Sequence, residues 1–246
     1  MIPKTPALGL SAAILLAALP VSTQAQVNDF EDGTTQGWQT SLLGMGGAPQ
    51  PQAVAGGFGG PTDHYLLATS FGGSGPGSRL TIINPTEWAG DYLTNGVSGF
   101  SARLINLGST DLYLRLMFED PGSMTPPSNI AFSDDAFFLP AGGGWTEAFF
   151  SASPAALLAG IGTVEGALAN TTTLRLYHSF DDAFPNPPFG TQPIIAQLGL
   201  DDFRAVRAAG AVPEPASWAL LIAGFGLAAG ALRTRTRSPR LARPLG

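Results

Sequence analysis

The feature that most constrains the fold is a series of short alternating segments separated by clusters of glycine and proline. Between Asp111 and Phe118, leucine or phenylalanine occupies every second position, and residues 145–150 and 174–179 alternate in a similar way. A period of two residues is typical of a β-strand with one buried face. The 32 glycines and 21 prolines of the 246-residue chain lie mainly between these segments, where they predict turns.

Other segments complete the predicted architecture. Further strand candidates are residues 65–71, 79–83, 99–107, 130–138 and 195–206. About eight or nine strands with such turns predict two packed antiparallel sheets, that is, an all-β sandwich. One helix is expected over Pro154–Ala169, because proline suits a first helical turn and several alanines and leucines follow it. We assign the sandwich to residues 26–209.

The N-terminal residues have the pattern of an export signal. Lys4 precedes an apolar run of 13 residues, 7–19, and small residues around Ala25 follow it. A basic start, a short apolar core and a small-residue exit are typical of a signal peptide. The run is too short to cross about 30 Å of hydrocarbon as a helix. We therefore predict a signal peptide over residues 1–25, removed by signal peptidase.

The C-terminal region combines a short motif, an apolar stretch and a basic tail. The motif is Val212, Pro213, Glu214 and Pro215, and residues 216–232 carry no charge. A helix over those 17 residues would span about 25 Å, enough for a thin bilayer. Five arginines occur in the tail, residues 233–246. They predict that this end stays in the cytoplasm and that the sandwich lies across the membrane.

This order of motif, apolar helix and arginines, over residues 212–237, resembles the PEP-CTERM sorting signal of Gram-negative bacteria. The resemblance implies that an exosortase, a membrane transpeptidase-like enzyme, recognises the chain and cuts near Pro213-Glu214-Pro215. It also implies export across the inner membrane, transient anchoring by the C-terminal helix, and delivery to the cell surface or the exopolysaccharide matrix. A plain C-terminal anchor is the alternative, but it explains the helix and the arginines without explaining the motif.

The charge of the predicted exported part limits its partners. Residues 26–212 contain six basic and 17 acidic residues and no lysine, which gives a net charge of −11 with histidine neutral. Binding to nucleic acid is excluded, because no basic stripe is available to neutralise phosphates. An acidic exported domain instead favours divalent cations, above all calcium. The absence of cysteine excludes disulfides, thiolate metal sites and cysteine nucleophiles.

Short motifs along the sandwich resemble the jelly-roll sandwiches grouped as galactose-binding-like, which include carbohydrate-binding modules and laminin B type domains. The motifs are residues 28–33 with Gly37-Trp38, residues 88–92, Gly144-Trp145, the run from Ala155 through Leu174-Arg175, and residues 200–203. The resemblance implies a jelly-roll fold whose first and last strands are adjacent. It also implies a structural calcium ion near those strands.

Carboxylates at the two ends of the sandwich are the calcium candidates. Asp29, Glu31 and Asp32 lie near its start, and Asp201 and Asp202 lie near its end. Calcium takes about six to eight oxygen ligands, so two or three of these side chains with backbone oxygens would suffice. We expect Asp29, Glu31, Asp201 and Asp202 to supply them. The alternative is that these are solvated acids at strand ends.

Aromatic side chains are the candidates for sugar binding. Trp88, Tyr92 and Trp145 could form a stacking platform, because a flat ring offers an apolar face to a pyranose. The alternative is that these rings belong to the core, which is the stronger expectation for Trp38. The alternation of apolar and polar side chains along a strand does not show which face of the strand is exposed to solvent.

No pattern in the chain marks an enzyme. Asp134-Asp135 and Asp181-Asp182 have no surroundings typical of a glycosidase acid and base, and the sequence lacks the nucleophile elbow of hydrolases and the zincin motif. His64 and His178 are distant in the sequence and are expected to be structural. We therefore predict a non-catalytic surface or matrix protein that contacts exopolysaccharide. The alternatives are a structural surface protein with no specific ligand and an enzyme that acts on polysaccharide.

Overall fold

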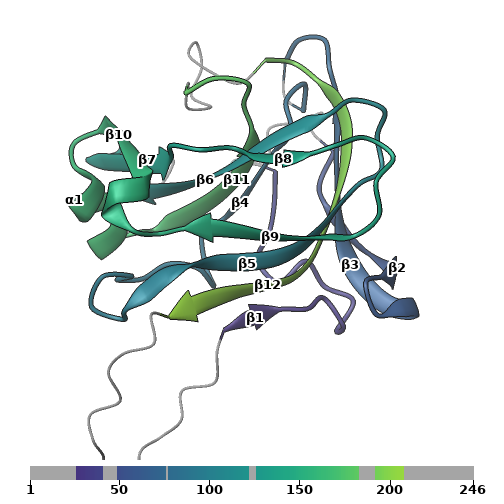
Figure 1. Ribbon diagram of the computed structural model, residues 1–246, viewed down its shortest axis with the longest axis horizontal. Coiled ribbons are helices and arrows are strands. Elements are labelled where there is room, and N and C mark those ends of the chain that lie inside the picture. Colours follow the sequence, from purple (N-terminus) through teal and green to yellow (C-terminus); the bar gives the residue numbers. More distant parts are fainter. Residues whose placement is uncertain (1–25, 41–48, 76, 122–125, 183–191, 208–246) are drawn as a thin grey trace, which may run out of the picture.

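The computed structural model describes residues 26–40, 49–75, 77–121, 126–182 and 192–207, which form two antiparallel sheets packed face to face (Figure 1). The first sheet consists of β1 (Val27–Asn28), β2 (Gln52–Gly57), β3 (Gly60–Phe71), β5 (Val97–Asn106), β9 (Thr146–Ser151) and β12 (Ile195–Arg207). The second consists of β4 (Thr81–Asn84), β6 (Leu112–Asp120), β7 (Asn129–Ser133), β8 (Phe137–Leu139), β10 (Leu157–Ile161) and β11 (Thr173–His178). The predicted jelly-roll type β-sandwich is confirmed.

Strand order agrees with the expected jelly-roll topology. The first sheet runs β2-β3-β12-β5-β9, with β1 paired to β12, and the second runs β10-β7-β6-β11-β4, with β8 paired to β6. The first and last strands are therefore adjacent, and Val27 lies opposite Arg204. Several connections cross from one sheet to the other, for example β3 to β4, β5 to β6 and β8 to β9, so residues distant in the sequence meet at each face.

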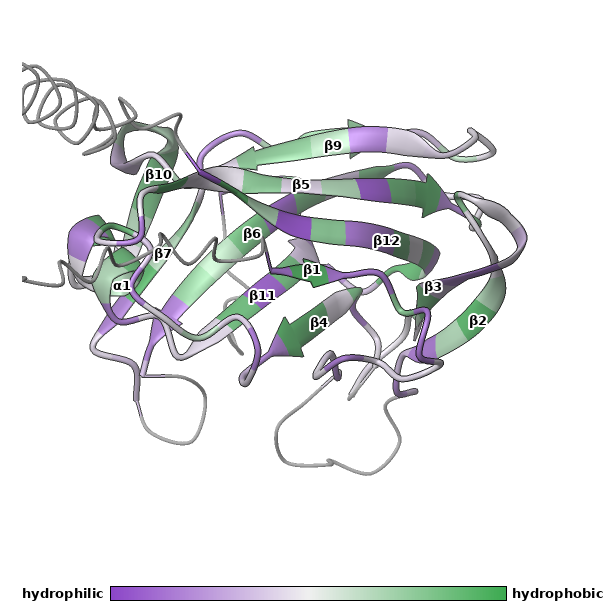
Figure 2. Ribbon diagram, turned by 90° about the horizontal axis from the view of Figure 1, so that it is seen from below, coloured by the Kyte–Doolittle hydropathy of each residue, from purple (hydrophilic) through white to green (hydrophobic). Residues whose placement is uncertain are grey.

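Alternation of side chains produces the core between the sheets. On β6, Leu112, Leu114, Leu116 and Phe118 are fully buried between the layers, as their spacing predicts. Hydrophobic and hydrophilic residues also alternate along β5 and β12 (Figure 2). Removing such side chains from water is the main favourable term in folding. The core residues lie between Phe30 and Phe203, so the described sandwich has a complete hydrophobic core of its own.

A buried polar group joins two core tryptophans. The Oδ1 atom of Asn28 accepts hydrogen bonds from the indole N–H groups of Trp38 and Trp88, at 2.9 and 2.5 Å. Its amide donates to Glu87 Oε2 at 2.6 Å. Because a buried polar atom without a partner is costly, this arrangement fixes β1 against the core. The prediction that Trp38 belongs to the core is confirmed.

Two predicted elements differ from the structure. The helix expected over Pro154–Ala169 is a 3₁₀ turn (Pro154–Ala156), strand β10 and a short helix α1 (Val164–Ala169). β10 pairs with β7 at the edge of the second sheet, and this pairing outweighs the helix propensity of its leucines. The strand expected over residues 130–138 is divided into β7 and β8. β2 was not predicted, because alanine and glycine dominate its sequence.

The two predicted targeting segments, residues 1–25 and 212–246, lie outside the described residues. Within the described part of the chain, no helix has the length and apolar character needed to cross a membrane. The signal peptide, the membrane helix over 216–232 and the domain limits therefore stay predictions.

Candidate ligand and metal sites

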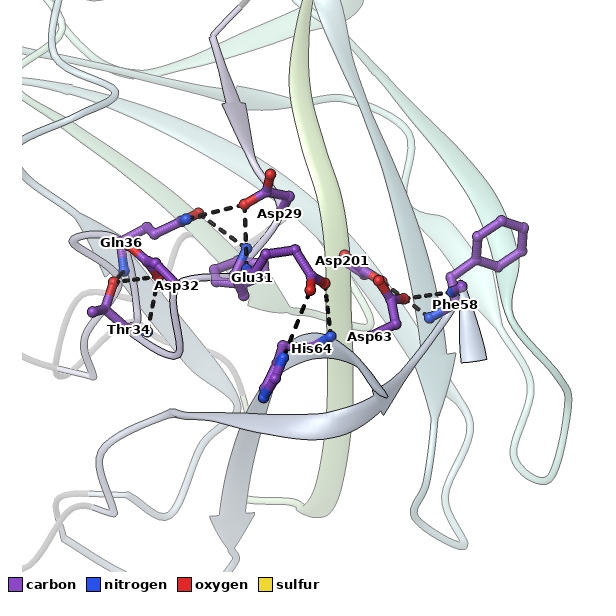
Figure 3. A network of polar contacts seen from close by, with 11 residues as sticks. Asp29, Glu31, Asp32, Thr34, Gln36, Phe58, Asp63, His64 and Asp201 are labelled. Carbon is purple, nitrogen blue, oxygen red and sulfur yellow. Dashed lines mark hydrogen bonds and ion pairs between the residues drawn. The ribbon is translucent and has the colours of Figure 1, made fainter. Parts of the chain in front are cut away.

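Three carboxylates meet beside the tip of the β2–β3 hairpin (Figure 3). Asp201 of β12 is only 3% exposed and accepts a hydrogen bond from the backbone N–H of Phe58 at 3.0 Å. Asp63 of β3 accepts one from the backbone of Gly59, and its side chain lies within hydrogen-bonding reach of both Glu31 and Asp201. We call Glu31, Asp63 and Asp201 the carboxylate cluster.

Glycines at the hairpin tip make room for this cluster. A Cβ atom on Gly57 would lie 2.5 Å from Asp63 Oδ2 and 3.0 Å from Asp201 Oδ2. A Cβ atom on Gly59 would lie 3.0 Å from Asp63 Cγ. The tip can fold over the carboxylates because it carries no side chains at these positions.

Glu31 links the cluster to the segment that follows β1. Its Oε1 atom accepts a hydrogen bond from the backbone N–H of His64 at 2.8 Å, and its Oε2 atom lies 3.7 Å from His64 Nδ1. Both contacts are partly exposed, so they position the chain more than they stabilise it.

The electrostatics of the cluster favour a shared proton. Burial, supported by the nearby charges of Asp63 and Asp202, raises the pKa of Asp201 to about 6, although two backbone N–H groups oppose the shift. Burial alone would raise the pKa of Asp63, but hydrogen bonds from Gly59 and with the Glu31 and Asp201 side chains hold it below its usual value. Two carboxyl groups this close do not ionise independently.

The structure brings together only some of the predicted calcium ligands. Glu31 and Asp201 share the cluster, whereas Asp29 accepts hydrogen bonds from Glu31 N and Gln36 Nε2, and Asp32 binds Thr34. Asp202 forms an ion pair with Arg204 at 3.0 Å. The register of β12 against β5 shifts between Asp201 and Arg204, and Asp202 in this bulge has a positive φ of 51°.

Asp63 was missed, because only the hairpin places it beside β12. The glycine-rich turn just before it was the available indication in the sequence. Among the described residues, no group of three or more histidine, aspartate or glutamate side chains is already arranged as a metal site.

Two of the three predicted stacking residues belong to the core. Trp88 is 1% exposed and Tyr92 is 6% exposed, and both pack edge-on against Phe100. Neither ring can lie against a sugar in this structure, which corrects the prediction for these two residues. They are buried because the loop from Trp88 to Gly96 closes one end of the sandwich, where it bonds through Gly90 to Thr171.

Trp145 lies partly exposed on the outer face of the first sheet. Its ring centroid is 5.3 Å from that of Tyr65, with the two planes at 83°. Gly199 lies on β12, next to the strand that carries Tyr65, and a Cβ atom there would be 2.5 Å from Ile105 Cγ2 and 3.0 Å from Tyr65 Cδ2. The missing side chain leaves the space that the Tyr65 ring occupies.

Charged groups adjoin this aromatic pair. The guanidinium of Arg103 lies 4.4 Å from the centroid of the Phe58 ring and 3.1 Å from Glu147 Oε2. A hollow of about 80 Å³ follows on the same face, lined by Ser101, Ala102, Arg103, Glu147, Asp202 and Arg204. We call Phe58, Tyr65, Arg103, Trp145 and Glu147 the aromatic platform. Arg103 and Glu147 give it one positive and one negative charge.

His64 lies beside the carboxylate cluster, whereas His178 and Asp182 lie elsewhere. Burial lowers the pKa of His178 to about 4, so the ring is neutral at pH 7, and its Nδ1 atom accepts a hydrogen bond from the Tyr113 N–H at 2.9 Å. Asp182 pairs with Arg115 at 3.2 Å. These contacts are structural, as expected for His178, and they do not form an acid–base pair across a cleft.

Comparison with known proteins identifies the C-terminal motif. Residues 211–237 match the PEP-CTERM protein-sorting motif, which confirms the predicted sorting signal. This motif implies export, processing by an exosortase and a cell-surface or extracellular location in Gram-negative bacteria. No curated protein sequence matches the chain.

Solved structures resemble the sandwich. An exo-β-agarase matches with a TM-score of 0.50 and 10% identity over 76% of this chain and 26% of that chain, so the sandwich spans about a quarter of it. A family 11 carbohydrate-binding module from Clostridium thermocellum, solved with a β-1,3-1,4-mixed-linked tetrasaccharide, has a TM-score of 0.47 and 10% identity over 75% of this chain and 96% of that chain.

A tandem of family 22 carbohydrate-binding modules from Paenibacillus barcinonensis Xyn10C has a TM-score of 0.46 and 17% identity, over 81% of this chain and 50% of that chain. At these identities the similarity concerns the fold.

Proposed function

We propose that the protein is an exported, non-catalytic sandwich of the cell surface or extracellular matrix, and that it binds exopolysaccharide through the aromatic platform. The observation that carries the proposal is the Tyr65–Trp145 pair, held partly exposed over Gly199 beside Arg103 and Glu147. We also propose that the sandwich is related to the galactose-binding-like group, which includes laminin B type domains.

The chemistry of the platform suits a sugar chain. An aromatic ring offers an apolar face to the C–H groups of a pyranose, and neighbouring charged or amide groups take its hydroxyls. Arg103 and Glu147 supply a donor and an acceptor next to Trp145. Because the exported part carries a net charge of −11, a neutral glycan is favoured over an acidic one.

A glycan array probed with residues 26–210, with and without calcium, tests this proposal. We expect binding to neutral glycans, and Trp145→Ala should weaken it about tenfold, since losing one stacked ring costs about 1.4 kcal/mol. Phe71→Ala is the matched control, because Phe71 is an exposed ring at the far end of β3. Equal binding by Trp145→Ala and the parent protein would contradict the platform.

The burial of Trp88 and Tyr92 favours the second candidate, a structural surface protein without a specific ligand. The same array decides between the two. Binding to none of the neutral or acidic glycans would support the structural role.

We further propose that the carboxylate cluster holds a structural calcium ion. Its oxygens are the donors that calcium prefers, and a cation would stabilise the charged form of Asp201, whose pKa is raised chiefly by burial. Glu31, Asp63 and Asp201 would hold the ion together with backbone oxygens. Asp29 and Asp202 make other contacts and are not part of this set.

Thermal unfolding of residues 26–210 tests the calcium proposal. Calcium should raise the melting temperature, and EDTA should reverse the rise, because a ligand that binds only the folded state stabilises it. Asp63→Asn should abolish the rise, whereas Asp29→Asn should retain it. A melting temperature that is insensitive to calcium would rule the site out.

A further inference from the structure

Strand β9 forms a border of the first sheet, and its outer side pairs with no other strand of the described chain (Figure 2). Its pairing with β5 runs from Thr146 to Ser151 without a register shift. A strand with one unpaired side presents a row of N–H and C=O groups, which is a template for another strand. The border at β9 is therefore a surface where a further chain can add to the sheet.

The backbone groups on the free side of β9 belong to its odd-numbered residues. The Ala152 N–H, directly after the last residue of β9, donates to the Ser98 carbonyl at 2.9 Å. Hydrogen-bonded and non-bonded pairs alternate in an antiparallel ladder, so the even-numbered residues of β9 bond to β5. Glu147, Phe149 and Ser151 therefore direct their N–H and C=O groups away from β5. In the described part of the chain, no backbone group bonds to them on that side.

The other three outermost strands are protected against such pairing. Register shifts interrupt β2 over residues 55–57 and β10 over residues 159–161. Bulges of this kind twist an edge away from a partner. On β4, Ile83 exchanges two backbone hydrogen bonds with Gln39, at 2.8 and 2.9 Å. Among the sheet borders that the structure describes, β9 alone has neither a register shift nor a bridge on its free side.

The side chains of β9 leave this border open. Lysine and proline, which natural edge strands use to prevent pairing, are absent from Thr146–Ser151. The one charged residue there, Glu147, forms an ion pair with Arg103 at 3.1 Å. Phe149 is 52% exposed, and its ring lies over Gly99 of β5, away from the free backbone. Two copies of the acidic sandwich can therefore meet at β9 with little repulsion between like charges.

We propose that β9 pairs antiparallel with β9 of a second copy of this chain, about a two-fold axis at Ala148. Glu147 then lies opposite the partner's Phe149 on the outer face of the sheet. Thr146 lies opposite the partner's Phe150 on the inner face, so each pair keeps to one face, as strand pairing requires. A second copy is the partner because the same strand on both sides makes the border self-complementary.

The proposed register agrees with the backbone and with the charges. It aligns the two strands over their full length, so that the free groups of Glu147 bond to those of the partner's Phe149. A register centred on Glu147 instead would place two carboxylates directly opposite each other, which is destabilising.

Such pairing would join two aromatic platforms. The two-fold axis is perpendicular to the sheet, so the outer faces of both first sheets form one surface, with Trp145 and Glu147 of each copy beside the junction. Two linked binding sites hold one long ligand more tightly than either site alone. This consequence rests on the proposed function, whereas the pairing itself does not.

Analytical ultracentrifugation of residues 26–210 over a dilution series, in EDTA and without glycan, tests the pairing. We expect a reversible equilibrium between monomer and dimer. Phe149→Glu should weaken the dimer about tenfold, because each new carboxylate faces the partner's Glu147. Phe149→Lys removes the same ring but faces that glutamate with the opposite charge, so it should dimerise as well as the parent. Phe71→Glu, at a similarly exposed ring on β3, is the control and should change nothing.

Cysteine cross-linking tests the same register independently. The chain has no cysteine, so Glu147→Cys and Phe149→Cys each introduce a single thiol. A mixture of the two variants should form a disulfide-linked dimer on oxidation, because the Cα atoms of a hydrogen-bonded pair are about 5.5 Å apart. Either variant alone should not, since diagonal neighbours are about 7–8 Å apart.

Two results would overturn the pairing. One is a protein that stays monomeric at every concentration and forms no cross-link in the mixture. The other is a dimer that Phe149→Glu and Phe149→Lys weaken equally. Neither measurement uses a glycan, so failure of the pairing is distinguished from failure of glycan binding on the array.

Discussion

At the scale of the single residue, Asp201 is an aspartate whose pKa is raised, whereas the pKa values of Asp32, Asp63 and Asp91 are lowered. Its pKa is about 6 in the folded protein because burial disfavours the charged form, whereas an unfolded aspartate titrates near 3.9. A raised pKa means that the folded state binds the proton more tightly than the unfolded state. The resulting stabilisation is complete below about pH 4 and is lost as the pH rises through about 6. The lowered pKa of Asp63 acts in the opposite direction.

Replacing Asp201 by asparagine separates the effect of its buried charge from the effect of its hydrogen bond. The amide oxygen of Asp201→Asn can still accept the Phe58 N–H, but it carries no buried charge. In EDTA at pH 7.5 we expect the variant to be as stable as the parent or about 1 kcal/mol more stable. The loss of stability between pH 5 and 7 should be smaller than in the parent.

Urea unfolding at pH 5, 6 and 7.5 measures the effect, with Asp29→Asn as the exposed control. A variant that is several kcal/mol less stable than the parent at pH 7.5 would show that the ionised carboxylate makes net favourable contacts.

The single-residue predictions succeeded where the adjacency of the first and last strands decides the outcome and failed where a hairpin tip or a loop decides it. Glu31 and Asp201 could be proposed as neighbours because first and last strands adjoin in such sandwiches. Asp63 could not, since its position depends on the tip of a hairpin whose first strand has weak strand propensity. Trp88 and Tyr92 were misplaced because nothing in a local sequence states which side of a loop faces the core.

At the level of elements, the strands with strict alternation were predictable, whereas two of the four outermost strands, β2 and β10, were not. β6 and β11 lie inside a sheet, where a buried face forces a period of two residues. β2 and β10 are the outermost members of their sheets and are held by one partner each. Their sequences resemble a loop and a helix, and tertiary pairing decides their conformation.

Gly199 offers a test of how one strand shapes the platform. The Cβ atom of Gly199→Ala would press on Ile105 and Tyr65, which must move away from it. We expect a loss of about 1–3 kcal/mol in stability, typical of overpacking, and weaker glycan binding because Tyr65 no longer supports Trp145.

Gly90→Ala is the control, because no atom lies within 4 Å of a Cβ atom at that position. Chemical denaturation and the glycan array measure the two effects. Unchanged binding by Gly199→Ala would show that the Tyr65–Trp145 contact is not needed by the ligand.

At the scale of the whole molecule, the first and last described residues of the chain lie side by side. β1 lies beside the last residues of β12, and the Ala205 N–H donates to the Gln26 carbonyl at 3.4 Å (Figure 1). The segments that precede and follow the sandwich therefore start from the same end of it. Only five residues separate Arg207 from Pro213, a reach of at most about 22 Å. The predicted membrane helix over residues 216–232 would therefore hold this end of the sandwich near the membrane until cleavage.

Removal of residues 211–246 should separate folding from sorting. The core lies between Phe30 and Phe203, so the truncated protein should unfold at the same temperature as the body released from cells. Without the sorting motif it should appear in the medium, not on the cell surface. Full-length protein with Pro213, Glu214 and Pro215 all replaced by alanine should instead accumulate as an uncleaved membrane-bound precursor. Cell fractionation with immunoblotting distinguishes protein in the medium, protein on the cell surface and uncleaved precursor in the membrane. Retention of the truncated protein on the surface would show that the sandwich itself, through its glycan contacts, is sufficient for attachment.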